Sequence, residues 1–399
     1  MGAGILFAMI LGERSLVVEP LGVIYMRLLK MVIVPLVFTS IVTGVAGIGD
    51  SKSLGRLGGK TFGYYLLTSM AAILVGLILT NIIRPGVGVD ILAGAEAFDP
   101  SQLKTPDSLG GIIIRMIPVN PLQAAATGDI LGLIFFSILL GYALTILKDE
   151  HRSFLLRLFD SLFQAIMTIT KGIIRLAPIG VFGLMVTAVG TAGFDLFLAV
   201  GKYMATIALG ITIHLFVILP TIYYLFTRMS PWRHYRAMAT AMATAFSTCS
   251  SGATLPVTMD CVENKVGVSN KITSFVLPLG STVNMDGTAL YECAGVLFIS
   301  QVLGLELTVT QQFAVVITAF LASVGAAAIP KAGLVMIFIV LEAVGLSSHP
   351  QVGLLVGTML AVDRPLDMLR TMTNVTSDSI GAAIIANSEN EEGLYSSLS

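Results

Sequence analysis

Charged residues are scarce in this chain: they make up 12% of its 399 residues, against 55% hydrophobic residues. The mean hydropathy is +0.89. A soluble domain carries about 25% charged residues, so the composition excludes an ordinary soluble protein. It is typical of a helical membrane protein, in which each span needs roughly 20 apolar residues. The formal net charge of −1 argues against a nucleic-acid partner.

Cysteine and histidine are also rare. The three cysteines (Cys249, Cys261 and Cys293) are too few and too scattered for a disulfide framework or a metal cluster. The four histidines (His151, His214, His234 and His349) share no metal-ligand spacing. We therefore expect structural roles for all seven residues.

Long apolar runs fill most of the chain, and they predict an all-α polytopic membrane protein with about eight transmembrane helices. The candidate spans are residues 1–12 (partial), 21–47, 61–83, 130–147, 155–189, 203–226, 272–303 and 352–387. Lys and Arg cluster in three connections, at 52–60, 148–157 and 228–236, whereas the loop 84–110 is acidic. The excess of basic residues places these three connections on the cytoplasmic side of a plasma (inner) membrane.

Two further apolar stretches, about 233–262 and 309–346, are interrupted at mid-length by Gly, Ser and Pro, at 247–256 and 323–330. Non-helical backbone at membrane depth survives only where it is buried in protein or lines a cavity. Both stretches are therefore predicted to be re-entrant helical hairpins. In each, Thr-Ala-Phe precedes a proline by 12 residues. Paired interrupted segments of this kind indicate inverted repeats and mark the binding site of a transporter.

A polar stripe crosses the last apolar segment. Asp363, Asp367, Arg370, Asn374 and Asp378 recur at steps of 4, 3, 4 and 4, which places them on one face of a helix. The planar fork of Arg370 suits a carboxylate, Asp367 suits an ammonium group, and Asp363 would orient Arg370. The alternative is an internal Asp–Arg network that serves folding alone, although buried ion pairs are poor net stabilisers.

Asn284-Met285-Asp286-Gly287-Thr288 interrupts the span 272–303 and predicts local unwinding. Freed backbone carbonyls, together with the side-chain oxygens of Asn284 and Asp286, would form a site for a hard cation. Asn374 and Asp378 offer further oxygen ligands. A polar kink buried against neighbouring helices is the alternative.

Two more groups of polar residues lie within apolar spans. Tyr64-Tyr65 and Thr68-Ser69 share one helix face, where interhelical hydrogen bonding is the competing interpretation. Glu292 is a lone carboxyl in an apolar helix and therefore a candidate to carry a proton, against the alternative of a buried glutamate with satisfied hydrogen bonds.

Three motifs together resemble the glutamate transporter family, the dicarboxylate/amino acid:cation symporters. They are the serine-rich first hairpin ending Ala-Thr-Leu-Pro at 253–256, the Asn-Met-Asp-Gly-Thr motif at 284–288, and the series from Asp363 to Asp378. The resemblance covers nearly the whole chain. It implies a prokaryotic-type symporter, not an enzyme, that takes up aspartate or glutamate with sodium ions and no other cofactor.

The resemblance also implies a homotrimer in the lipid bilayer, in which a mobile domain crosses the membrane like an elevator. The scaffold would comprise 1–60 (the first two spans), 84–155 (the fourth-span region) and 156–190 (a peripheral span). A further span at 191–230 would precede the first hairpin. The transport domain would comprise 61–83, hairpin 1 (231–268), the broken span (269–305), hairpin 2 (306–348) and the last span (349–387), before a tail at 388–399.

Site residues follow from the resemblance by position. Arg370 would bind the side-chain carboxylate of the substrate and Asp367 its amino group. The other substrate-binding residues would be Thr371, Asn374, Thr288, Ser250, Ser251, Ile329, Gly333 and Asp363. Three sodium sites would consist of Gly280, Asn284, Asn374 and Asp378; of Thr282, Met285, Ser323, Val324 and Ala326; and of Tyr65, Thr68, Ser69, Asn284 and Asp286. Glu292 matches the acidic residue that accompanies proton coupling.

Several residues depart from the family pattern or suggest other functions. Cys249 and Met368 stand where relatives carry arginine, and Ala326 and Lys331 are unusual in the second hairpin. Arg364-Pro365 is closer to C4-dicarboxylate carriers, which lack an aspartate at position 367. A gated anion channel is a third interpretation. Gly47-Ile48-Gly49-Asp50 matches the GxGD pattern of intramembrane aspartyl proteases, but the second catalytic aspartate is missing.

Overall fold

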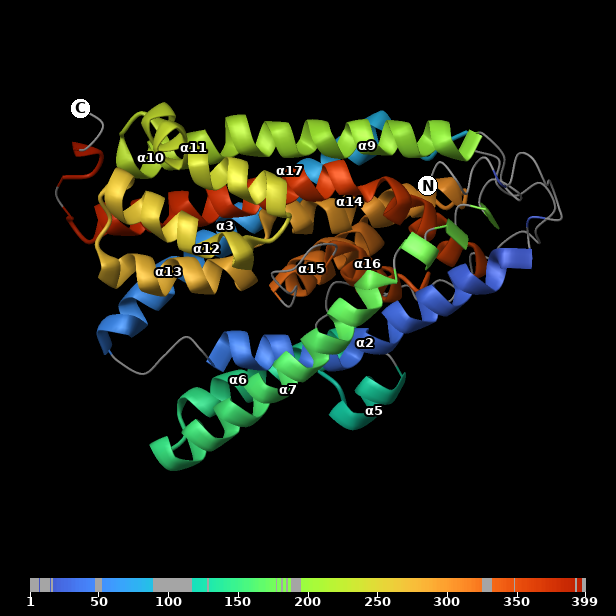
Figure 1. The fold of residues 1–399 in the computed structure, drawn as a ribbon, viewed down its shortest axis with the longest axis horizontal. Coiled ribbons are helices and arrows are strands. Elements are labelled where there is room, and N and C mark those ends of the chain that lie inside the picture. Colours follow the sequence, from blue (N-terminus) through green and yellow to red (C-terminus); the bar gives the residue numbers. More distant parts are fainter. Residues whose placement is uncertain are drawn as a thin grey trace.

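A computed structural model describes Phe7, Ser15 and residues 17–46, 52–88, 117–127, 129–176, 178–180, 182–183, 186–187, 195–324, 332–347, 349–391 and 393–396. Most of these residues are helical, and none of them lies in a β-strand (Figure 1). The all-α prediction is therefore confirmed for this part of the chain. The GxGD match at 47–50 and most of the acidic loop lie outside the described residues.

The helices before the first interrupted segment are α2 (Glu19–Ala46), α3 (Lys52–Ile83), α5 (Pro121–Thr127), α6 (Ile130–Thr145), α7 (Asp149–Arg175), α9 (Asp195–Ile213), the π-helical turn η3 (His214–Ile218) and α10 (Leu219–Thr227). They are followed by α11 (Pro231–Thr248), α12 (Ser251–Asp260), the π-helical turn η4 (Cys261–Val266), α13 (Asn270–Val283), α14 (Asp286–Val302), α15 (Val309–Val324), α16 (Ala332–Ala343) and α17 (Pro350–Ser388).

Three helical segments of the described residues are long and apolar enough to cross a membrane: Arg56–Ile83, Asp149–Thr170 and Val200–Thr227. One other expected span is interrupted, since α13 and α14 are separated by two non-helical residues. Another, α17, is continuous but carries the polar stripe. The expected total of about eight spans therefore stays a prediction.

Helix α14 lies at the centre of the bundle. It packs against α3, α9, α15, α16 and α17, and its residues are buried from Asp286 to Ser300. Figure 1 shows α17 running through the bundle with α9 along one side, while α2, α6 and α7 pack together on the opposite side. The central position of α14 places the Asn-Met-Asp-Gly-Thr motif in the interior of the bundle.

The first interrupted segment consists of two helices packed against each other, α11 and α12. Helix α11 ends where Cys249 adopts a left-handed conformation with φ of 53°, and Ser250 caps α12 by accepting a hydrogen bond from the Ala253 backbone N–H. The break is thus confined to residues 249–250. The expectation of irregular backbone as far as Pro256 is wrong, because the serine cap starts the next helix at once and Pro256 lies inside α12.

The second interrupted segment also contains two helices in contact, α15 and α16. Its expected break at 323–330 lies mostly outside the described residues, and so do Ala326, Ile329 and Lys331. Whether either segment is re-entrant, and whether the two are inverted repeats, stays a prediction.

The predicted unwinding at the Asn-Met-Asp-Gly-Thr motif is confirmed. Helix α13 ends at Val283, Asn284 and Met285 are non-helical, and α14 begins at Asp286. The predicted helix for the polar stripe is also confirmed, since Asp363 to Asp378 lie within the single 39-residue helix α17.

Candidate functional site

Asp363, Asp367 and Arg370 form one buried cluster on α17. Arg370 donates a hydrogen bond to Asp367 at 2.8 Å and another to Asp363 at 3.2 Å. Its guanidinium lies 3.8 Å from the ring centroid of Tyr291, in the cation–π arrangement. All four side chains are buried. The guanidinium is therefore held in a fixed orientation inside the protein, with carboxylates along one edge and an aromatic ring against its face.

Asn374 and Thr371 continue the stripe. Asn374 accepts a hydrogen bond from the Gly287 backbone N–H at 2.8 Å, and its amide lies 3.3 Å from the hydroxyl of Thr288. The first turn of α14 is thereby attached to α17. Thr371 is buried and bonds to the backbone carbonyl of Asp367, one turn earlier in the same helix.

The break between α13 and α14 collects oxygen atoms from three helices. Asn284 donates hydrogen bonds to Asp378 at 2.9 Å and to Ser377 at 3.0 Å, both on α17. Its side-chain oxygen lies 3.3 Å from the Thr68 hydroxyl on α3. Ser69 donates a hydrogen bond to Asp286 at 2.7 Å. Hydroxyl, amide and carboxylate oxygens gathered in this way are the ligands that hard cations bind.

Two expected sodium ligands flank this break. The Tyr65 hydroxyl donates to the carbonyl of Val276 at 2.7 Å. A methyl group added at Gly280 would lie 2.5 Å from an oxygen of Asp378 and 2.7 Å from the Tyr65 hydroxyl, so this glycine leaves room for both. The residues expected for the first and third sodium sites are thus brought together, although their role as ligands stays a prediction.

The second expected sodium site is described only in part. Val324 packs in the same apolar cluster as Val283, and α13 contacts α15. Thr282 and Ser323 each donate a hydrogen bond to a carbonyl of their own helix, and Met285 is buried.

Both interrupted segments reach the site. Ser251 donates a hydrogen bond to the Ser281 carbonyl of α13 at 2.8 Å. From the other segment, a methyl group added at Gly333 would lie 3.1 Å from Thr288 and 3.5 Å from Arg370. Backbone of α16 therefore approaches the guanidinium closely, as a binding-site wall requires.

Glu292 is buried on α14, one residue after Tyr291, and neither carboxylate oxygen has a hydrogen-bond partner among the described residues. The alternative of a glutamate with satisfied hydrogen bonds finds no support among these residues. A carboxyl in such a place is far less costly when it carries a proton.

Sequence reasoning assigned His214 to a structural role, but its ring lies 3.0 Å from the carboxylate of Asp286 and both side chains are fully buried. Seventy-two residues separate the two positions. No local spacing signals such a contact, because only the packing of η3 against α3 and α17 brings the ring to the break.

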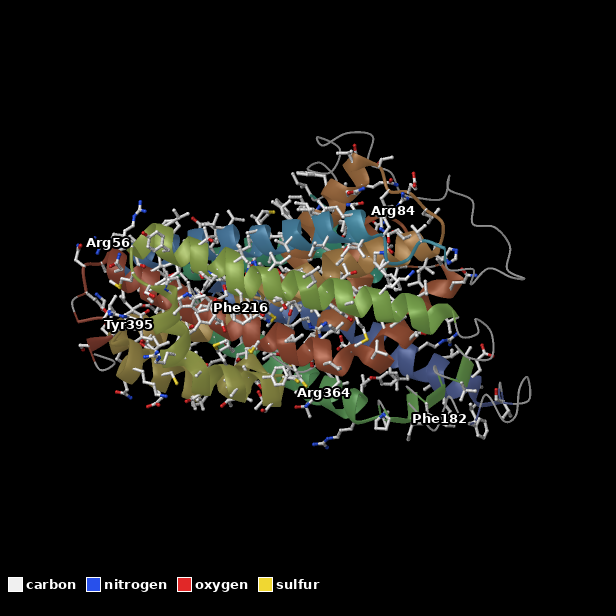
Figure 2. All side chains as sticks on the ribbon, turned by 90° about the horizontal axis from the view of Figure 1, so that it is seen from above. Arg56, Arg84, Phe182, Phe216, Arg364 and Tyr395 are labelled. Atoms are coloured by element: carbon white, nitrogen blue, oxygen red, sulfur yellow. The ribbon has the colours of Figure 1, made fainter. Side chains whose placement is uncertain are left out.

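Arg364 lies apart from Arg370. Its side chain is exposed and reaches the Ser247 carbonyl at 3.4 Å, at the end of α11. Figure 2 places it between the two ends of the bundle, of which one carries Arg56 and the other Arg84. Arg364 therefore contacts the end of hairpin 1 and not the buried charges.

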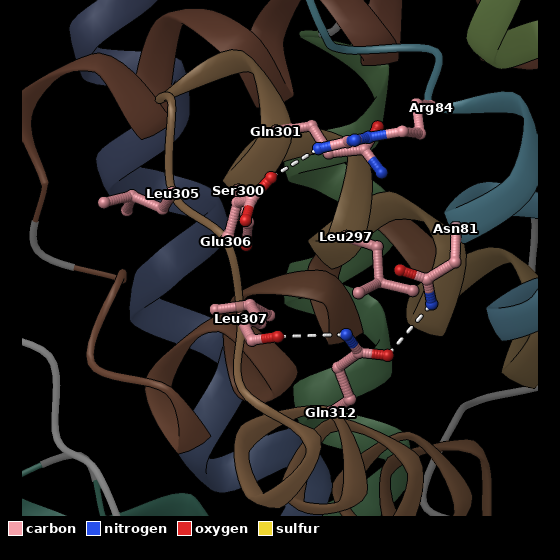
Figure 3. Close-up of a pocket in the computed structure, with 9 residues that line it drawn as sticks. All are labelled: Asn81, Arg84, Leu297, Ser300, Gln301, Leu305, Glu306, Leu307 and Gln312. Carbon is pink, nitrogen blue, oxygen red and sulfur yellow. Dashed lines mark hydrogen bonds and ion pairs between the residues drawn. The ribbon is translucent and has the colours of Figure 1, made fainter.

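A pocket opens at the end of the bundle that carries Arg84 (Figure 3). Its polar lining consists of Asn81, Arg84, Ser300, Gln301, Glu306 and Gln312. Four of these residues bond in pairs, with 2.6 Å between Arg84 and Glu306 and 2.9 Å between Asn81 and Gln312. None of the lining residues belongs to the expected site, which is a buried cluster and lies elsewhere.

The amino-acid sequence is similar to known proteins over most of its length. The model of the sodium:dicarboxylate symporter family matches residues 1–388. Neutral amino acid transporter A of Bos taurus is 37% identical, over 91% of this chain and 75% of its own length. Excitatory amino acid transporter 3 of Homo sapiens is 35% identical, over 91% and 78%. The proton/glutamate-aspartate symporter of Escherichia coli (strain K12) is 33% identical, over 97% and 92%.

Proposed function

Because this chain belongs to the sodium:dicarboxylate symporter family, we propose that it takes up aspartate or glutamate together with sodium ions and a proton. Its relatives include excitatory amino acid transporters and a proton/glutamate-aspartate symporter. The observation that carries the proposal is the buried group of Asp363, Asp367 and Arg370 on α17.

An acidic amino acid has the charges to replace the contact between Arg370 and Asp367. Its side-chain carboxylate takes the guanidinium, and its ammonium group takes the carboxylate of Asp367. Each buried charge thus exchanges one partner for another of the same sign, and Asp363 continues to orient Arg370. This exchange matters because a buried charge that loses its partner costs about 3–5 kcal/mol.

A C4-dicarboxylate lacks the ammonium group and would leave Asp367 without a counter-charge. Arg364, the residue that suggested such a substrate, is exposed and contacts the Ser247 carbonyl. These two observations favour an amino acid over a dicarboxylate.

Sodium coupling follows from the balance of buried charge. The described residues bury five acidic side chains, Asp286, Glu292, Asp363, Asp367 and Asp378, against the single arginine Arg370. With Glu292 protonated, four carboxylates face one guanidinium, which leaves three negative charges uncompensated. Unpaired buried charges are expensive by several kcal/mol each. Three sodium ions at the expected sites would neutralise them, so that cations stabilise the form that binds an anionic substrate.

The proton is assigned to Glu292, which has no hydrogen-bond partner among the described residues. Glu292 follows Tyr291 in the chain, and the ring of Tyr291 lies against the guanidinium of Arg370. A protonated Glu292 leaves the positive charge of Arg370 available for the substrate. Release of this proton inside the cell would couple uptake to the proton gradient.

The movement that carries the site across the membrane is proposed to be an elevator motion of residues 61–83, both hairpins and the last two spans. Residues 1–60, 84–155 and 156–190 would form the scaffold of a homotrimer in the plasma membrane. The packing of α3 against α14 and α17 supports this grouping, and Ser69 of α3 donates a hydrogen bond to Asp286 of α14.

Ligand-dependent thermal stabilisation of the purified protein tests the proposal. A ligand that binds only the folded state raises stability by about 2.7 kcal/mol at 100 times its dissociation constant. Aspartate and glutamate should raise the melting temperature in sodium and not in potassium, and malate and serine should do so much less. Equal stabilisation by malate, or stabilisation without sodium, would contradict the assignment.

A further inference from the structure

The carboxylate of Asp286 is surrounded by three donors from three helical elements. Ser69 of α3 donates to Oδ1 at 2.7 Å. Ser377 of α17 donates to Oδ2 at 2.6 Å, and Nε2 of His214 lies 3.0 Å from the same oxygen. Oδ2 therefore receives two donors and Oδ1 receives one, which leaves Oδ1 the oxygen with room for a cation.

The tautomer of His214 follows from its surroundings. A carboxylate only accepts hydrogen bonds, so Nε2 carries the proton and donates to Asp286. Nδ1 is buried and has no partner among the described residues. The ring is thus a donor directed at one oxygen of Asp286.

The backbone at His214 is unusual in a way that serves this contact. The straight helix α9 ends at Ile213, and His214–Ile218 form the π-helical turn η3, closed by a hydrogen bond from the Leu219 N–H to the His214 carbonyl. Such π turns occur frequently at functional sites. Here the turn keeps His214 and Leu215 buried while Phe216 and Val217 face outward.

We propose that His214 is a positioning residue for sodium: it holds the Asp286 carboxylate so that Oδ1 points toward the Thr68, Ser69 and Asn284 oxygens. The assignment rests on the proposed sodium site. Partners that orient a metal ligand from behind typically change metal affinity about 10–100-fold when they are removed. His214 never contacts the ion and acts through the geometry of Asp286.

The test compares His214→Gln, whose amide can still donate toward Asp286, with His214→Met, which has similar length and no donor. The sodium concentration that gives half-maximal thermal stabilisation is measured at saturating aspartate. The lithium concentration that gives half-maximal stabilisation is then measured in the same way. His234→Gln is the matched control, because His234 is equally buried but bonds to Ser379 and Tyr395.

His214→Met should raise the sodium half-saturation at least about tenfold and change the sodium-to-lithium preference. His214→Gln should restore most of the affinity, and His234→Gln should leave it unchanged. The assignment is overturned if His214→Met keeps the sodium half-saturation of the wild type. It is also overturned if His214→Met does not fold and His214→Gln folds but shows altered sodium affinity. A wild type without sodium dependence would instead overturn the proposed coupling, and this assignment with it.

Discussion

Asn284 donates a hydrogen bond to Asp378 across 2.9 Å, and this contact joins the break between α13 and α14 to the C-terminal half of α17. The same amide contacts Thr68 on α3 through its oxygen. One side chain therefore connects the residues of two expected sodium sites. If both sites bind sodium, a cation that repositions Asn284 at one site would change the ligands available at the other.

Replacing Arg370 with lysine should weaken acidic-substrate binding while the fold is kept. Lysine retains the positive charge but loses the planar fork and the stacking on Tyr291. We expect the aspartate dissociation constant to rise tenfold or more, which corresponds to about 1.4 kcal/mol. Arg364→Lys is the control and should change it less than about twofold, within the range of a surface contact. Calorimetric titration in sodium measures both, and unchanged aspartate affinity in Arg370→Lys would contradict the assignment.

Replacing Asp367 with asparagine should alter the choice of substrate. The variant removes the charge that the ammonium group of an amino acid needs, while its amide still accepts a hydrogen bond from Arg370. Aspartate affinity should fall and competition by malate or succinate should become stronger relative to it. Competition against labelled aspartate measures the ratio. If the variant kept the wild-type ranking of aspartate over malate, Asp367 would not be the ammonium partner.

Adding one methyl group at Gly280 should remove sodium dependence. The new atom would lie 2.5 Å from Asp378 and 2.7 Å from the Tyr65 hydroxyl, so at least one expected ligand must move. Overpacking of this kind costs about 1–3 kcal/mol. Gly63→Ala is the matched control, because this exposed helical glycine has open space around it and the change should be neutral or stabilising by about 0.5–1 kcal/mol. Thermal melts with and without sodium separate the two. A normal sodium response in Gly280→Ala would exclude this glycine from the site.

Neutralising Glu292 should uncouple transport from protons. In Glu292→Gln the side chain can no longer take up or release a proton, so an inward proton gradient should stop stimulating aspartate uptake while the sodium gradient still drives it. Glu306→Gln, which changes an exposed carboxylate in the distant pocket, should behave as the wild type. Uptake with imposed pH gradients measures the effect, and proton stimulation that persists in Glu292→Gln would assign the proton elsewhere.

The end of α17 should be held less firmly at low pH. Lys60 donates a hydrogen bond to Glu389 at 2.6 Å and Arg56 pairs with it, which lowers the pKa of Glu389 from its ordinary value of 4.5. A lowered acid pKa stabilises the fold above the ordinary value, and the contribution is lost as pH falls through the lowered one. The difference in melting temperature between wild type and Glu389→Gln should therefore be present at pH 7 and vanish well below pH 4.5. A difference independent of pH would show that charge is not its cause.

Local patterns predicted the parts of the site that lie within one segment. The helical spacing of Asp363 to Asp378 and the break at Asn284 both follow from neighbouring residues, and the structure confirms them. Sequence could not predict contacts between distant segments. His214 reaches Asp286 from 72 residues away. Ser377 was likewise absent from the expected ligands, although it binds Tyr64, Asn284 and Asp286.

The role of Arg364 also needed the structure. Its place directly after Asp363 resembles the pairing in C4-dicarboxylate carriers, but one step along a helix rotates a side chain by about 100°. Asp363 faces inward to Arg370, so its neighbour turns outward toward hairpin 1. A residue that directly follows a functional residue in a helix is therefore expected on a different face of that helix.

Uptake of labelled aspartate into proteoliposomes tests the central claim most directly, namely that cations neutralise the buried carboxylates and thereby drive uptake of an acidic amino acid. An inward sodium gradient should produce accumulation of aspartate inside the vesicles, and its collapse with a sodium ionophore should release the accumulated substrate. Vesicles with potassium on both sides should show no accumulation. Accumulation that is equal with and without the sodium gradient would contradict the account.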